Sequence, residues 1–261
     1  MGVRVVRRSG RGIELTSWGA IYLQRVLAAV EQLRKAQDDV DRARRSNHLA
    51  VSALPSLATK WLGPLLFDWK ALHPNASVLI EGVDGEPRLD DGDADFRVSY
   101  GARCRAHKRY LHLFTDHVVA VASPALIAAS GPLGHPRDLV SKPLLWIDWG
   151  PEYVAPPTWR DWMIAAGVSA EHLQCNLTFS LSSAAVDAAI EGRGFALAQY
   201  SMAASALSNG ALVKIFPQTL PLPEAYFLAW NGSAVDKPLA AAFHAWLLAE
   251  ARRFDNSNTR R

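Results

Sequence analysis

The spacing of hydrophobic positions changes several times along the chain, beginning with a short alternating segment. Apolar residues alternate with polar ones over 3–7 and 13–15, and Ser9-Gly10-Arg11-Gly12 between them suits a turn. This pattern predicts a β-hairpin, which is too short to be stable without packing against another element. Thr16 suits a helix N-cap, and residues 17–45 contain no proline, so we expect one helix of roughly 28 residues there.

The apolar residues of this helix recur at alternating steps of three and four, which is the a/d seam of a coiled coil with one polar position, Gln37. The residues between them are mostly charged or polar. A helix lying on its own body would show a wider apolar face, so the narrow seam favours a partner helix and a homodimer. The expected dimerisation residues are Leu23, Val26, Val30, Leu33 and Val40.

Beyond residue 46 the pattern changes to strands alternating with helices. The first group comprises expected strands at 48–54, 76–83, 95–100 and 111–122 and a helix at 56–72. The second comprises helices at 124–129, 158–166 and 183–191 and strands at 143–147, 176–179 and 195–199. A strand at 225–230 and a helix at 237–253 then return to the first group. This order predicts an α/β fold with mostly parallel sheets, in two lobes joined by two crossing strands.

We therefore expect three domains. Residues 1–15 form the hairpin, 16–46 the long helix and 47–261 the two-lobed body. Within the body, lobe I would hold 47–122 and 222–261, and lobe II would hold 123–221. A hinged pair of this kind leaves a cleft between its lobes.

Composition agrees with a folded chain and excludes some classes of protein. The 261 residues are 49% hydrophobic and 20% charged, which suffices for two compact lobes. No apolar stretch reaches the roughly 18 to 20 residues of a membrane span, and no apolar run follows the basic N-terminus as in a signal peptide. We therefore expect a cytoplasmic protein without a membrane partner. The two cysteines, Cys104 and Cys175, lack CxxC spacing and are expected to be reduced thiols.

Positive charge is concentrated at the N-terminus. Residues 1–46 hold ten Lys/Arg and five Asp/Glu, a net +5, so the remainder carries +3 − 5 = −2. A basic tip on a near-neutral body indicates contact with a polyanion such as DNA, although a solvated tail would have the same composition. The expected DNA-contact residues are Arg4, Arg7, Arg8 and Arg11.

The segment GVRVVRRSGRGIELTSWG, followed by a long helix, resembles the wing and linker helix of a LysR-type transcriptional regulator. Val5 and Val6 depart from the usual Leu-Phe pair. The matching positions are Gly2, Arg7, Leu15, Thr16 and Gly19. The segments SYG, VASPALI, PLGHPRDL, WRDWMIAAGV, AAVDAAIEGRGFALAQ and AFHAWLLAEA resemble the effector-binding domain of the same family, in the subgroup related to the activator of glycine cleavage. The resemblance implies a two-lobed, periplasmic-binding-protein-like fold, a small-molecule effector, and a homodimer or tetramer.

In that family a helix-turn-helix of roughly 30 residues precedes the wing and reads the major groove. Met1 falls where its recognition helix would end. Because wing arginines position a protein on DNA but do not read bases, we expect promoter binding by this chain to be weakened. Two explanations stay open: a start codon further upstream, or a shortened regulator.

The effector should bind where strands end and helices begin, because free backbone N–H groups and the helix dipole favour an anion there. Two helix starts face the expected cleft, and serine hydroxyls can donate there or serve only as caps. We expect a small, carboxylate-bearing ligand, with Trp146 and Trp149 bordering the cleft. The expected effector-binding residues are Pro55, Ser56, Leu57, Tyr100, Gly101, Ser180, Ser182, Ser183 and Gln199.

Other functions are less well supported. Cys104, His107, His112 and His117 lack the spacing of a zinc site, and His112 and His117 would point to opposite faces of one strand, so no metal is expected. No cofactor motif is present, and no nucleophile and base can be paired, so no enzyme activity is expected. A solute-binding receptor without DNA binding is the alternative, since it shares the two-lobed hinge.

Overall fold

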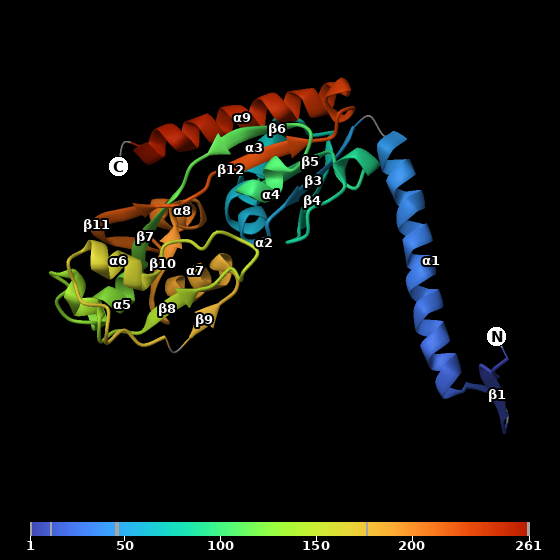
Figure 1. Cartoon of the computed structure of the whole chain (residues 1–261). Helices are drawn as coiled ribbons and strands as arrows, with labels where there is room; N and C mark the ends of the chain where they lie inside the picture. The colour runs from blue at the N-terminus through green and yellow to red at the C-terminus, as the bar shows by residue number, and fades with distance from the viewer. Residues whose placement is uncertain (1, 11, 45–46, 176, 260–261) are drawn as a thin grey trace. The chain divides into compact units, whose positions relative to one another are not determined.

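The computed structural model describes residues 2–10, 12–44, 47–175 and 177–259. Tertiary contacts divide the chain into two units, residues 1–46 and 47–261. Each unit has its own architecture (Figure 1).

The first unit is a β-hairpin followed by one helix. Strands β1 (Val6–Ser9) and β2 (Gly12–Leu15) pair antiparallel, as predicted. Helix α1 spans Ser17–Arg44, and the Thr16 hydroxyl caps it by accepting from the Gly19 amide at 3.0 Å. The same hydroxyl donates to the Arg4 carbonyl at 2.8 Å, which joins the hairpin to the helix start. Gly19 is required here, because an added Cβ would lie 1.8 Å from the Val5 carbonyl oxygen.

Lobe I of the second unit is built on a five-stranded sheet in the order β4-β3-β5-β12-β6. Helices α3 and α9 cover one face, where Trp69 of α3 packs against Phe243 of α9 and Phe243 packs against Phe96 of β5. The strands are β3 (His48–Ala53), β4 (Ser77–Gly82), β5 (Phe96–Tyr100), β6 (Tyr110–Phe114) and β12 (Tyr226–Trp230). The helices are α2 (Pro55–Leu57), α3 (Gly63–Leu72), α4 (Ala102–Arg105) and α9 (Pro238–Thr259), with the 3-10 turns η2 (Leu89–Asp91) and η4 (Ala234–Asp236).

The helix predicted over 56–72 forms, but it contains a π-helical turn, η1 (Ala58–Leu62), between α2 and α3. The Gly63 amide donates to the Ala58 carbonyl, five residues back. Pro64 has no amide hydrogen, so the regular ladder is interrupted at this point. Glycine suits position 63, since a Cβ would lie 2.7 Å from the Ala58 oxygen.

Lobe II is built on a second five-stranded sheet in the order β11-β7-β10-β8-β9. Its strands are β7 (His117–Ala122), β8 (Leu144–Ile147), β9 (Thr178–Phe179), β10 (Phe195–Gln199) and β11 (Val213–Pro221). Its helices are α5 (Pro124–Ala129), α6 (Trp159–Ala165), α7 (Ser182–Ile190) and α8 (Tyr200–Ser208), with the 3-10 turn η3 (Pro136–Leu139). Of the strand predicted over 176–179, Asn176 lies outside the described residues.

Two predictions about the sheets are wrong. The strand expected over 111–122 is two strands, β6 and β7, which belong to different lobes. The chain therefore enters lobe II at Thr115-Asp116, ahead of the predicted boundary after residue 122. The sheets are also not mostly parallel, because the strands next to each crossing, β12 and β7, run antiparallel to both neighbours.

Candidate functional site

A cavity of about 130 Å³ lies between the two lobes. Its walls come from the start of α2, from the segments after β4 and β8, and from the starts of α7, α8 and β12. A drug-sized ligand typically needs about 300 to 1,000 Å³, so this volume suits a small metabolite. The lining residues are Leu54, Pro55, Ser56, Leu57, Asp84, Trp149, Tyr153, Ser180, Leu181, Ser182, Gln199, Met202 and Tyr226.

The starts of α2 and α7 meet at this cavity through their serines. The Ser56 hydroxyl oxygen accepts from the Ser183 amide at 3.1 Å and lies 3.3 Å from the Ser183 hydroxyl. The Ser182 hydroxyl accepts from the Trp149 indole N–H at 2.9 Å. Neither helix receives a cap from the residue that precedes it, Leu54 or Leu181. The Ser183 amide is thus held by Ser56, and Pro55 has no amide hydrogen. The two helix starts nevertheless meet at one small space, and their dipoles favour a negative charge there.

Most of the residues predicted for the effector site lie together. Pro55, Ser56, Leu57, Ser180, Ser182 and Gln199 line the cavity, and Ser183 is attached to it through Ser56.

Tyr100 and Gly101 do not line the cavity. Tyr100 is 2% exposed and lies behind the wall, with its ring 5.2 Å from those of both Trp149 and Tyr226. Its hydroxyl accepts from the Glu224 amide at 3.0 Å, and burial raises the pKa of Tyr100 to about 12. Gly101 adopts φ +67°, and its amide donates to the Ala225 carbonyl at 2.9 Å. Both residues therefore lie behind the cavity wall and not on its surface.

Four further residues line the cavity that no sequence pattern had indicated: Asp84, Tyr153, Met202 and Tyr226. The first two lie in connecting segments, where no strand or helix end marks a site. Trp149 borders the cavity as predicted, whereas Trp146 lines a separate small pocket beside β8.

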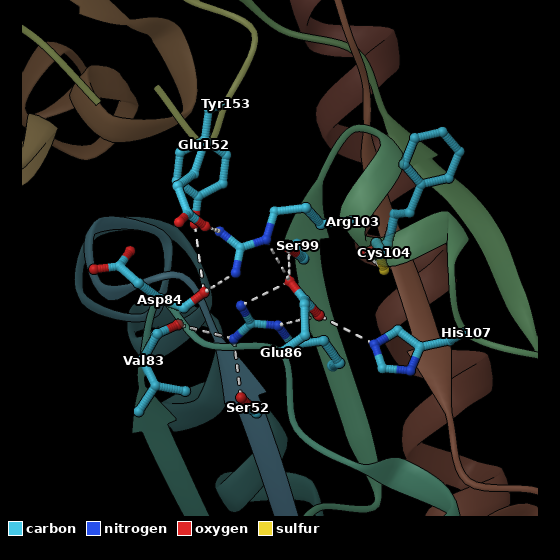
Figure 2. A network of polar contacts seen from close by, with 12 residues as sticks. Ser52, Val83, Asp84, Glu86, Ser99, Arg103, Cys104, His107, Glu152 and Tyr153 are labelled. Carbon is cyan, nitrogen blue, oxygen red and sulfur yellow. Dashed lines mark hydrogen bonds and ion pairs between the residues drawn. The ribbon is translucent and has the colours of Figure 1, made fainter. Parts of the chain in front are cut away.

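Lobe I contains a network of ion pairs and hydrogen bonds centred on Glu86, close to the cavity residue Asp84 (Figure 2). The Arg97 side chain, 0% exposed, donates through Nε and Nη2 to the two carboxylate oxygens of Glu86, each at 3.1 Å. Ser52 accepts from Arg97 Nη1 at 2.9 Å, and the Ser99 hydroxyl donates to Glu86 at 2.7 Å. Burial raises the pKa of Glu86, but Arg97, Ser99 and the imidazole of His107 more than offset it, so that the pKa lies below its usual value. Glu86 is therefore held as a carboxylate.

The segment after β8 contacts this network through Glu152 and Tyr153. Arg103 lies at the edge of the network, where its guanidinium pairs with Glu152 at 3.1 Å and sits 5.0 Å from the centre of the Tyr153 ring. Arg103 also donates to the Asp84 carbonyl at 3.0 Å. Figure 2 shows the Asp84 carboxylate directed away from these partners. The cavity residue Tyr153 thus comes from lobe II but is positioned by a lobe I arginine.

The cysteine and histidines that resembled metal ligands have other surroundings. Cys104 is buried at lobe I, where desolvation raises its pKa to about 12, and it is not bonded to Cys175. His107 pairs with Glu86, and His112 faces the Phe227 ring. His117 stacks on Tyr200 in lobe II. His112 lies on β6 and His117 on β7, so the prediction that they share one strand is wrong. Within the described residues, no three potential ligands come together as a metal site.

In the first unit, Arg4, Arg7 and Arg8 are exposed on the hairpin, and Arg7 pairs with Glu14 at 3.1 Å. Arg11 lies outside the described residues, and of Val40 only the backbone is described. Along α1 the exposed apolar residues form a broader set than the predicted seam: Trp18, Ile21, Tyr22, Leu23, Leu27, Val30 and Leu33. None of the described helices combines the length and apolar character needed to cross a bilayer.

Comparisons with known proteins agree with this architecture. The family model for the LysR substrate binding domain matches residues 42–252. The glycine cleavage system transcriptional activator of Escherichia coli strain K12 is 31% identical over 252 residues, which cover 96% of this chain and 80% of that protein.

Two solved structures extend the comparison to the fold. The effector domain of the transcriptional regulator AmpR of Pseudomonas aeruginosa has a TM-score of 0.63 and 26% identity, over 80% of this chain and 98% of that one. CrgA, a LysR-type regulator from Neisseria meningitidis, shares the fold at a TM-score of 0.60 and 18% identity, over 96% and 84% of the two chains. The expected two-lobed effector-binding fold is confirmed, and a regulator is favoured over a solute-binding receptor. The chain belongs to the LysR-type transcriptional regulators.

Proposed function

We propose that this regulator senses a small carboxylate in the cavity between its lobes, and that it acts by binding rather than by catalysis. The observation that carries the proposal is the meeting of two helix starts at Ser56 and Ser183. Backbone N–H groups and hydroxyls there can hold an anion that touches both lobes. A ligand that bridges the lobes stabilises one hinge arrangement by as much as its affinity differs between arrangements. We place this sensing in the cytoplasm, where promoters are found.

A cavity-blocking substitution tests the site. Ser180 is exposed and lines the cavity, so Ser180→Trp should fill the space with little effect on folding. In a screen of small carboxylates by thermal unfolding, a binder at about 100 times its Kd should stabilise the wild type by about 2.7 kcal/mol. Ser180→Trp should lose this stabilisation.

The matched control is Ser208→Trp, an exposed serine at the end of α8 that does not line the cavity. It should respond to the ligand like the wild type. Equal responses of all three proteins would place the binding site elsewhere.

We further propose that α1 pairs with α1 of a second copy. Its large apolar side chains are exposed over several turns, for example Leu27 at 59% and Leu33 at 71%. Such a surface is stabilised when a partner helix covers it. Two such dimers could form a tetramer through their effector domains, as the resemblance to the family implies.

A charge placed in the seam should weaken this dimer. Val30→Glu would bury a carboxylate between two apolar helices, which costs several kcal/mol, so the dissociation constant should rise at least tenfold. Sedimentation equilibrium would measure it, with Ala28→Glu, an exposed position on the helix face opposite the seam, as the control. An unchanged dissociation constant for Val30→Glu would refute pairing through this face.

The paired hairpins would present Arg4, Arg7 and Arg8 to promoter DNA, and we assign the same role to Arg11. Each arginine that neutralises a phosphate releases counterions, so these contacts add affinity without reading sequence. Arg7 contributes less than the others, because Glu14 already neutralises part of its charge.

A further inference from the structure

The cavity holds acceptors as well as the N–H groups that favour an anion. Gln199 is 2% exposed and lines the cavity, and its Oε1 accepts no hydrogen bond from any residue that the structure describes. A buried amide oxygen without a partner costs free energy, and a donor supplied by a ligand would remove that cost. Gln199 lines both this cavity and the small pocket beside β8, and a ligand in the cavity with an N–H or O–H group could satisfy its oxygen.

Asp84, an exposed residue of the cavity wall, brings a carboxylate to the same region. Its backbone carbonyl receives Arg103, but its carboxylate makes no ion pair or hydrogen bond with the described part of the chain. Arg103 cannot easily turn to it, because its guanidinium is already held by Glu152 and by the Tyr153 ring. The cavity is thus left with one carboxylate that a cationic group of a ligand can neutralise.

Aromatic rings complete this side of the cavity. Trp149, Tyr153 and Tyr226 all line it, and ring faces attract an ammonium group by cation–π interaction. A metal ion would instead need several oxygen ligands, whereas Asp84 is the one carboxylate that lines the space among the residues that the structure describes. An ammonium matches the combination of one carboxylate, one amide oxygen and aromatic rings.

We infer that the effector is a small zwitterion of the α-amino acid class, with its carboxylate at the α2 and α7 starts and its ammonium toward Gln199 and Asp84. The inference rests on the proposed function, since it assigns the second end of the same ligand. The volume of about 130 Å³ limits the side chain of the ligand to a few atoms.

Three ligands with the same carbon skeleton separate the contribution of the positive charge from that of the hydrogen-bond donor. L-alanine carries a charged donor, L-lactate an uncharged donor and propionate no donor at the α carbon. After a thermal-unfolding screen of the standard L-amino acids, titration calorimetry would compare these three and the best amino acid with its α-hydroxy and unsubstituted analogues. The wild type should bind the amino form most tightly, then the hydroxy form, then the unsubstituted acid.

Two substitutions then test which protein side chains bind the α-amino or α-hydroxy group of the ligand. Asp84→Asn should weaken the amino form about fivefold and leave the hydroxy form unchanged, because Asp84 is exposed and its charge is partly screened. Gln199→Leu should weaken the amino and hydroxy forms at least tenfold and spare the unsubstituted acid. Asp68→Asn, an exposed aspartate on α3, is the control and should change none of the three.

Different failures have different meanings. If Ser180→Trp abolishes binding but the amino, hydroxy and unsubstituted acids bind the wild type equally, the carboxylate site stands and the zwitterion is refuted. If amino acids bind but Asp84→Asn leaves their preference over hydroxy acids intact, the assignment of the ammonium is refuted. If no carboxylate of any kind binds, the proposed function and this inference are both overturned.

Discussion

Replacing Arg97 by methionine is expected to lower the free energy of unfolding by about 3 to 5 kcal/mol. Arg97 is fully buried on β5, and it satisfies both oxygens of Glu86 as well as Ser52 and the Val83 carbonyl. Methionine would leave the Glu86 carboxylate in a largely buried place without its main partner. Among its other described partners, Arg103 is 3.9 Å away and is shared with Glu152, and the His107 imidazole lies 3.0 Å away.

Urea unfolding of the full chain would measure this loss as a shift of the transition midpoint. Arg88→Met is the control, because Arg88 pairs with Asp91 and Asp93 at the surface with its side chain 75% exposed. It should cost at most about 1 kcal/mol. The double variant Arg97→Met with Glu86→Leu should be more stable than Arg97→Met alone, since it leaves no buried charge. Equal losses for Arg97→Met and Arg88→Met would show that the network does not stabilise lobe I.

The second large effect concerns Asp116, where the chain crosses into lobe II. Asp116 is 3% exposed, and its carboxylate accepts from the amides of Ser201, at the start of α8, and of His117. Burial raises the pKa of Asp116 from its ordinary 3.8 to about 7, against the effect of these hydrogen bonds. The folded protein therefore binds a proton that the unfolded chain releases between pH 3.8 and 7. Stability from this group is greatest below pH 3.8 and is lost as the pH rises to about 7.

His117 opposes this trend in the same pH range. Burial, and then the charge of Lys214, lowers the pKa of His117 from 6.5 to about 4, so its contribution to stability is lost as the pH falls through that interval. The two residues offset each other in the wild type. In Asp116→Asn only the histidine effect persists, and stability should fall as the pH is lowered from 6.5 to 4.

The difference in unfolding free energy between the wild type and Asp116→Asn should change by roughly 4 kcal/mol between pH 4 and pH 8, at 1.36 kcal/mol for each unit of pKa. Unfolding curves at intervals of half a pH unit would measure it. A difference that stays constant over this range would mean that Asp116 is ionised in the fold like an ordinary aspartate.

Elements with strong periodicity were predictable from the sequence. The coiled-coil spacing over Leu23–Leu33 and the Thr16 cap locate α1, and glycines locate the hairpin turn. The strand expected over 111–122 failed because its residues all favour strands, whereas Asp116 turns inward to cap α8 and ends the pairing. The strand β11 was missed because Pro217 and Pro221 interrupt its pattern, and the structure has a register shift at that point.

The part of the cavity wall that is formed by helix starts was predictable, because the direction of the chain decides which ends of the helices meet there. Helix starts such as Ser56 and Ser183 can be read from local sequence, and the lobes bring them together. Asp84 and Tyr153 could not be found in this way, because they reach the cavity only through Arg103 and the packing of one lobe on the other. Tyr100 lies behind the cavity wall, because a strand end indicates the edge of a sheet but not which side chains reach its surface.

The two crossing segments are themselves tied together, since the Leu222 amide donates to the Asp116 carbonyl at 2.8 Å. Neither segment can twist alone without breaking that bond. Any swing of one lobe against the other must therefore move the two crossing segments together, and it would change the ion pair between Lys60 of lobe I and Asp187 of lobe II. That ion pair is the natural place to attach a distance probe that reports opening.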